Sequence, residues 1–209
     1  VREDYPDLAW AFSVEVAPPF DSGTVSMGTY FGDSSGASGS HHGMINFLST
    51  PGPLDMDLTN MIQKSRFAFP EARQAIAAHR SVFSVSVGSV DETIPARFDA
   101  ARRMTCLTAI FAKLPTCLGI YFPSADLILP PKTWVAAADM AHKGKFPALQ
   151  WINYAVAALT ETTFTVNTIG CAAFNGHEVC MPAVKLDPKE AVQHVFAATV
   201  IMLEYGHEY

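Results

Sequence analysis

The sequence predicts a single α+β domain over residues 1–209, in which a mixed, mostly antiparallel sheet carries helices packed on one face. Three observations predict this class. Segments with alternating apolar residues are short and are separated by turns rich in Gly, Pro and Asp. Segments with helical periodicity, about ten to twenty residues long, lie between them. The 209 residues are 49% hydrophobic and 16% charged, which is enough apolar surface for one core.

The N-terminal part of the chain is predicted to form strands. Residues 8–16 alternate apolar and polar side chains, and residues 25–31 repeat the pattern after a turn that begins at Pro18, so a hairpin is expected. Gly, Ser and Asp dominate residues 32–43, which predicts a flexible loop. A third strand is expected at residues 44–48.

A helical region and a strand are expected next. Residues 57–80 have a helical composition with Asp57 or Thr59 available as the N-terminal cap, and Pro70 must interrupt the helix because proline cannot continue it. Residues 81–87 show the clearest alternation in the sequence, which predicts a strand buried on one face.

The middle of the chain combines long helices with short strands. Residues 94–114 place apolar side chains along one helical face, which predicts a helix. Residues 118–122 and 125–129 are expected to form two short strands or one bent strand. A further helix is predicted for residues 132–142, ended by Gly144.

The C-terminal part is predicted to form a second hairpin, from residues 149–157 and 164–169, and another strand at residues 178–184. Residues 188–205 predict a helix with proline in its first turn and Asp187 as its cap.

Composition excludes two classes of partner. The net charge is −6 and no basic run is longer than Arg102-Arg103, so neither nucleic acid nor an anionic membrane is expected to bind. The longest apolar stretch, within residues 195–203, is well short of the ~20 residues that cross a bilayer. Residues 1–7 are acidic and polar, unlike a signal peptide, so a cytoplasmic location is expected.

The low charge content also bears on assembly. With 16% charged residues there are few polar groups to cover the surface, which predicts an interface with a second copy, as in a homodimer, or with another protein partner. The four cysteines show no C-x-x-C spacing, so they are expected to be reduced and buried. No cofactor and no metal is predicted.

Residues 32–36 read Gly-Asp-Ser-Ser-Gly and match the G-x-S-x-G pattern of hydrolases. A nucleophile elbow requires a helix directly after the serine, but the residues that follow are small and favour a loop. The same segment lacks the G-K-[ST] of a phosphate-binding loop. A solvated loop is therefore the preferred interpretation.

Histidine, cysteine and acidic residues offer two further hypotheses. Metal binding could draw on the pair that begins at His41 and on His177, Glu178 and Cys180, although these groups are far apart in sequence. Acid-base catalysis could use Glu178, whose position beside His177 and before an apolar run would raise its pKa if it were buried. A structural Glu178 that accepts hydrogen bonds from backbone donors of the turn is the commoner arrangement. Other acidic candidates are Asp126, Asp139 and Glu161.

From about His79 onward the chain resembles an uncharacterised bacterial family with a domain of unknown function. The residues that carry the resemblance are Leu118-Gly119-Ile120-Tyr121, Leu149-Gln150-Trp151 and the segment from Thr168 to Glu178. The family pattern in that segment is Thr-Gly, a small residue, Ala-Phe-Gly and an acidic residue, whereas here Asn175-Gly176 extends the Phe-Gly step and Cys171 and His177 replace apolar residues. The resemblance implies a single domain of that type and supplies no catalytic residue.

Taken together, the sequence favours a non-catalytic binding or protein-interaction domain. The candidate binding residues are Asn175, His177 and Glu178. The alternative is a small hydrolase or metal-dependent enzyme that uses His177 and Glu178. A cleft in which these groups converge would favour the enzyme, and an exposed apolar surface would favour the interaction domain.

Overall fold

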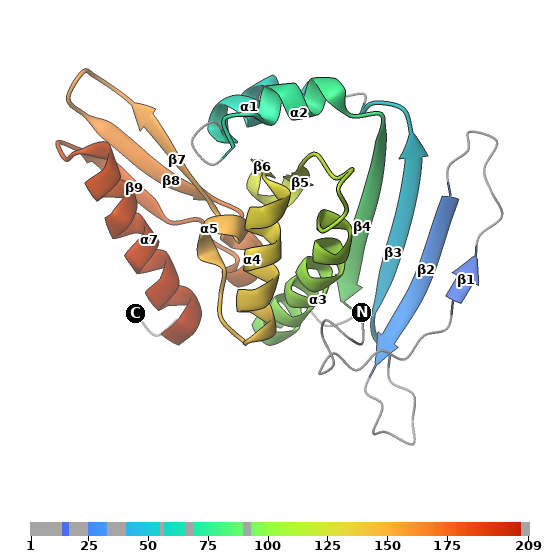
Figure 1. Cartoon of the computed structure of the whole chain (residues 1–209). Coiled ribbons are helices and arrows are strands. Elements are labelled where there is room, and N and C mark those ends of the chain that lie inside the picture. Colours follow the sequence, from blue (N-terminus) through green and yellow to red (C-terminus); the bar gives the residue numbers. More distant parts are fainter. Residues whose placement is uncertain are drawn as a thin grey trace.

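The computed structural model describes residues 14–16, 25–32, 41–54, 57–65, 69–89 and 93–205 (Figure 1). It confirms the α+β class. All described strand pairs are antiparallel, and the strands form three sheets, ordered β1-β2-β3-β4, β5-β6 and β7-β8-β9, where the sequence predicted one. Helices α3 (Ile94–Ala112) and α4 (Pro131–His142) lie between the first sheet and the C-terminal sheet (Figure 1).

The first sheet consists of β1 (Val14–Val16), β2 (Val25–Gly32), β3 (His41–Pro51) and β4 (Ser81–Ser89). Strands β2 and β4 confirm the expected ones, and β3 is longer than the predicted 44–48 at both ends. Of the strand expected at residues 8–16, β1 confirms the last three residues, and residues 8–13 lie outside the described residues. The predicted flexible loop at 32–43 falls mostly on residues 33–40, which lie outside the described residues, whereas residues 41–43 belong to β3.

Two short helices follow β3, because Pro70 interrupts the helical region as the sequence predicted. They are α1 (Thr59–Ser65) and α2 (Ala72–Ala78). The N–H of Thr59 donates to Oδ1 of Asp57 at 2.9 Å, so Asp57 is the cap that the sequence offered. Phe69 and Ala72 are buried with Ile128 in a small apolar cluster.

The centre of the molecule consists of two long helices and a small hairpin. Helix α3 (Ile94–Ala112) packs against β4 and against α4 (Pro131–His142). The hairpin strands β5 (Ile120–Phe122) and β6 (Leu127–Leu129) are joined by the 3-10 turn η1 (Pro123–Ala125) and are therefore separate strands. Figure 1 shows α3 beside β4, with α4 on its other side.

The C-terminal region contains α5 (Ala148–Trp151), β7 (Asn153–Ala158), β8 (Phe164–Ile169), α6 (Ala172–Asn175), β9 (Cys180–Val184) and α7 (Pro188–Tyr205). The predicted strand at 149–157 is wrong over its first residues, because 148–151 form α5. The strand expected at 178–184 begins two residues later, at Cys180.

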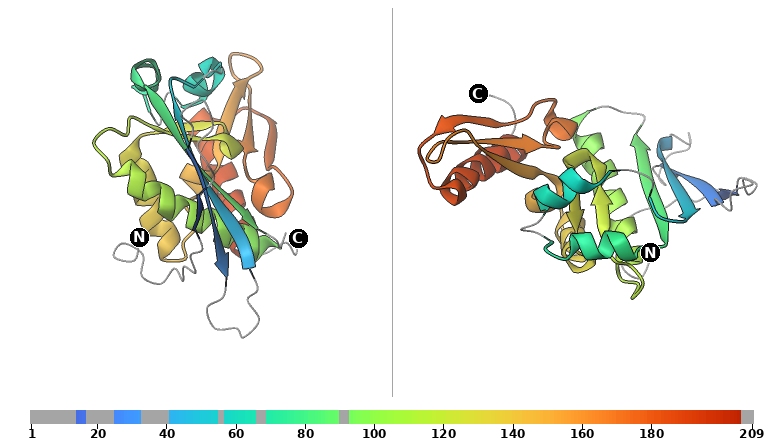
Figure 2. Two further views of the ribbon diagram at one scale, coloured as in Figure 1. Left: turned by 90° about the vertical axis from the view of Figure 1, so that its right-hand side faces the viewer. Right: turned by 90° about the horizontal axis from the view of Figure 1, so that it is seen from above.

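The core lies where α3, α4, α5 and α6 meet. Its centre is Trp151, which is fully buried and whose indole N–H donates to the hydroxyl of Thr105 at 2.9 Å. The aromatic side chains of Trp134, Trp151 and Phe174 are buried in this region and belong to the core. Helix α7 covers one face of the β7-β8-β9 sheet, and the β7-β8 hairpin extends away from the centre (Figures 1 and 2).

Candidate functional site

The candidate residues Asn175, His177 and Glu178 lie together in the connection between β8 and β9. Asn175 ends α6, and Gly176 follows with φ of 85°, in the left-handed region that glycine adopts readily. His177 and Glu178 then lead into β9. The structure thus brings the three residues into one turn, as their spacing in the sequence required.

The carboxylate of Glu178 faces back toward the start of α6. Each of its oxygens accepts two hydrogen bonds, at 2.9 and 3.2 Å on Oε1 and at 3.1 and 2.6 Å on Oε2. The donors are the N–H groups of Gly170, Ala172 and Cys171 and the hydroxyl of Thr168. Three N–H groups without a helical partner are thereby satisfied by one negative charge.

Thr168 holds this carboxylate in place. Thr168 is buried on β8, and its hydroxyl donates to Glu178 while it accepts the N–H of Val179 at 2.7 Å. The N–H of Thr168 also donates to the carbonyl of Val179 at 2.9 Å. The side chain of Glu178 is therefore held by Thr168 on β8, whose hydroxyl is itself held by the N–H of Val179.

The turn before α6 fits closely against the core. Gly170 has φ of 100°, and a Cβ there would lie 3.0 Å from the carbonyl oxygens of both Ser124 and Trp151. Phe174 of α6 stacks on Trp151 with ring centroids 5.4 Å apart and an interplanar angle of 12°. The segment that the sequence offered as a binding site thus docks the C-terminal sheet onto the centre of the molecule.

His177 takes a different position from Glu178. Its backbone N–H donates to Oδ1 of Asn175 at 2.9 Å, and its side chain is exposed. The amide nitrogen of Asn175 lies 3.2 Å from the sulfur of Met202 on α7. Ion pairs among the described residues include those of Asp99 with Arg102 and Arg103, and Nε2 of His194 lies 3.9 Å from Glu190. None of these pairs involves His177 or Glu178.

The other candidate groups lie on separate elements. Asp126 is in the β5-β6 turn with φ of 50°, Asp139 is on α4 and Glu161 is in the β7-β8 turn. His41 begins β3, in a different sheet from the turn of His177. Among the residues that the structure describes, no three His, Cys, Asp or Glu side chains gather closely enough to hold a metal ion. Of the Gly-Asp-Ser-Ser-Gly segment, only the first glycine is described, at the end of β2.

All four cysteines are free, as expected, but only two of them are buried. Burial raises the pKa of the Cys106 thiol to about 11, and burial followed by the nearby charge of Glu178 raises the pKa of Cys171 to about 11 as well. Burial also raises the pKa of Cys117. Cys180 is exposed on β9.

Sequence reasoning missed two features of this region. One is the role of Thr168 and Gly170, for which the signal was a threonine near the end of a predicted strand, a glycine directly after that strand and an acidic residue eight positions beyond the glycine. The other is the open edge of β7, which carries no charged side chain over residues 153–160. Both features depend on which strands pair in the folded sheet, and this pairing cannot be deduced from the sequence alone.

Comparison with protein-family models, with curated proteins and with solved structures finds no match for this chain. The similarity to a bacterial family of unknown function therefore stays a prediction. Within the described residues, no helix is long and apolar enough to cross a membrane.

Proposed function

We propose that this chain is a non-catalytic interaction domain that assembles with another protein chain, a second copy being the first candidate. The observation that carries the proposal is the apolar surface of the β7-β8 hairpin. Val156 on β7 is 44% exposed, and Leu159, which directly follows β7, is 58% exposed. The β7-β8 hairpin extends from the molecule (Figure 1). Apolar side chains that project in this way mark protein interfaces more often than catalytic centres.

The enzymatic alternative has weaker support. Its proposed acid or base was Glu178, and both oxygens of that carboxylate accept hydrogen bonds from the chain itself. A carboxylate held in this way would have to break those bonds before it could accept a proton from a substrate. His177, its proposed partner, has its side chain directed to solvent.

Sedimentation velocity at rising protein concentration tests the proposal. We expect the weight-average sedimentation coefficient to rise with concentration from the monomer value toward that of a dimer. Because the interface is apolar, the association should persist at about 1 M salt, where the Debye length is only ~3 Å and charge-driven contacts are screened. A sedimentation coefficient that stays at the monomer value up to about several hundred micromolar would contradict the proposal, because even a weak dimer forms at such concentrations.

A further inference from the structure

Among the strands that the structure describes, β7 and β9 are the two edges of the β7-β8-β9 sheet, and residues that block a further strand occur only at β9. At the β9 edge, Pro182 has no N–H to donate, and Lys185 follows the strand. Proline and lysine at an edge are the usual protection against an additional strand. The β7 edge has neither, because residues 153–160 contain no proline and no charged residue.

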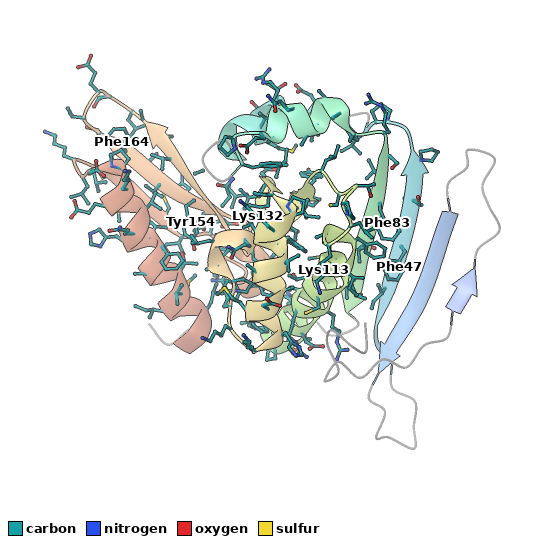
Figure 3. The ribbon with its side chains drawn as sticks, in the orientation of Figure 1. Phe47, Phe83, Lys113, Lys132, Tyr154 and Phe164 are labelled. Carbon is teal, nitrogen blue, oxygen red and sulfur yellow. The ribbon has the colours of Figure 1, made fainter. Side chains whose placement is uncertain are left out.

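The hydrogen-bond pattern fixes which backbone groups of β7 are open. The N–H of Leu159 donates to the carbonyl of Thr163 at 2.8 Å, so residues 159, 157, 155 and 153 bond to β8 in alternation. The N–H and C=O groups of Tyr154, Val156 and Ala158 therefore point away from β8, toward the open edge. Ala158 and Val156 are exposed, whereas Tyr154 lies nearer the core, next to Phe196 of α7 (Figure 3).

The side chains of this strand are complementary to a second copy of itself. If two β7 strands pair antiparallel about a two-fold axis at Val156, then Val156 faces Val156 and Tyr154 faces Ala158 of the other copy. A large residue thus meets a small one on both sides of the axis. The strand carries no charge, so two copies do not repel one another at this edge despite the net charge of −6.

The resulting assembly would also be closed. An antiparallel pairing of identical strands about a two-fold axis uses the same surface on both copies and leaves neither β7 free. The outer edges of the joined sheet are then the two β9 strands, each of which carries Pro182. Pairing therefore stops at two copies and does not continue into a fibre.

We infer that the open edge of β7 is the docking site for β7 of a second copy, with Val156 at the two-fold axis. This inference rests on the proposed function and adds to it the surface, the partner and the register. It places Val156 of each copy in a hydrogen-bonded pair, in which Cα atoms lie ~5.5 Å apart.

Charge variants at position 156 test the inference by sedimentation velocity. Val156→Lys and Val156→Glu should each weaken dimer formation about tenfold or more, because like charges directly opposite destabilise a strand pair. An equimolar mixture of the two should restore the dimer, since opposite charges then face each other. Leu118→Lys, at a position 40% exposed between α3 and β5, is the matched control and should dimerise as the parent does. Circular dichroism checks that each variant is folded.

Disulfide trapping supplies a readout that does not depend on the charge variants folding. In a Cys180→Ser background, Val156→Cys should form a covalent dimer under mild oxidation, because Cα atoms ~5.5 Å apart suit a disulfide. Leu114→Cys, also on an exposed position, should stay largely monomeric.

The outcomes separate the two claims. A parent chain that dimerises while the charge variants dimerise equally well and Val156→Cys does not cross-link would overturn the inference and leave the proposed function standing. Charge variants that are monomeric alone and stay monomeric when mixed would overturn the register at Val156. A parent that is monomeric at all concentrations would overturn the proposed function, and the inference with it.

Discussion

Glu178 is an exposed residue, yet both oxygens of its carboxylate accept hydrogen bonds from neighbouring residues of the chain. Exposure of a residue and freedom of its charged atoms are separate properties. The sequence predicted both possible roles of Glu178 and preferred the structural one, because acidic residues near Gly turns often accept backbone N–H groups. The geometry matches that preference, although it required β8 and β9 to be paired before it could be seen.

We expect Glu178→Ala to lower the free energy of unfolding by about 1–2 kcal/mol, because three backbone N–H groups and one hydroxyl lose their acceptor where solvent can only partly replace it. Glu178→Gln should cost roughly half of that, since the amide keeps one acceptor oxygen. Urea unfolding measures both. Glu190→Ala, an exposed carboxyl 3.9 Å from His194, is the control and should stay within about 0.5 kcal/mol of the parent. Equal stability of Glu178→Ala and Glu190→Ala would show that the carboxylate is not structural.

The thiols are predicted to differ in reactivity because only the thiolate is nucleophilic. Cys180 is exposed and should be alkylated first at pH 8, whereas Cys106 and Cys171 have pKa values raised to about 11 by burial and should react only after unfolding. Mass spectrometry of iodoacetamide-treated protein, with and without urea, identifies the sites. Rapid modification of Cys171 in the folded protein would contradict the burial of this side chain.

Asp99 predicts a pH dependence of stability. Burial alone would raise the pKa of this carboxyl, but the hydrogen bonds and charges of Arg103 and Arg102, at 2.6 and 2.7 Å, outweigh burial and hold the pKa below its usual value. A lowered pKa means that the stabilisation is present above about pH 4, the usual value for aspartate, and is lost as the pH falls through the folded-state value. Asp99→Asn should therefore lose less stability than the parent between about pH 5 and pH 2. Acid titrations of the parent and of Asp99→Asn, followed by circular dichroism, measure this difference. If stability fell with pH at the same rate in both proteins, the pairing of Asp99 with the arginines would be refuted.

At the scale of elements, the strands and the long helices could be predicted, whereas the four-residue helices could not. Helix α7 and strand β4 carry a periodicity that local sequence alone reveals, and both begin where the sequence placed them. Helices α5 and α6 have four residues each, too few to show a helical period or to be stable alone. They form because Trp151 and Phe174 stack in the core, and contacts of that kind are not visible until the fold is known.

Substitution of Gly170 tests whether close packing holds α6 in place. Gly170→Ala should destabilise the protein by about 2 kcal/mol or more, because a positive φ is unfavourable for alanine and its Cβ meets two carbonyl oxygens at 3.0 Å. Gly144→Ala has φ of 72° but nothing within 4 Å of the new Cβ, so it should cost only about 1 kcal/mol. Thermal or urea unfolding compares the two. Similar losses for both variants would mean that backbone conformation alone, and not the fit against Trp151, makes glycine necessary.

At the scale of the whole molecule, three sheets meet through a helical centre, and the β7-β8 hairpin extends from it (Figure 2). Among the described strands, β7 pairs only with β8. Composition predicted an interface from the scarcity of charge, but it could not locate one, because the free edge of β7 exists only after β8 has taken its other side. The segment that holds Asn175, His177 and Glu178 connects the C-terminal sheet to the core. The apolar surface that remains exposed on the hairpin is what supports an interaction domain.

Residue-resolved hydrogen exchange at two protein concentrations tests this account most directly. In dilute solution the amides of Ala155 and Ala157 should be protected by β8, while those of Val156 and Ala158 exchange rapidly. At high concentration the amides of Val156 and Ala158 should become protected by at least about tenfold, because they then bond to another chain. Exchange rates for Val156 and Ala158 that stay the same at both concentrations would contradict the claim that this edge binds a protein partner.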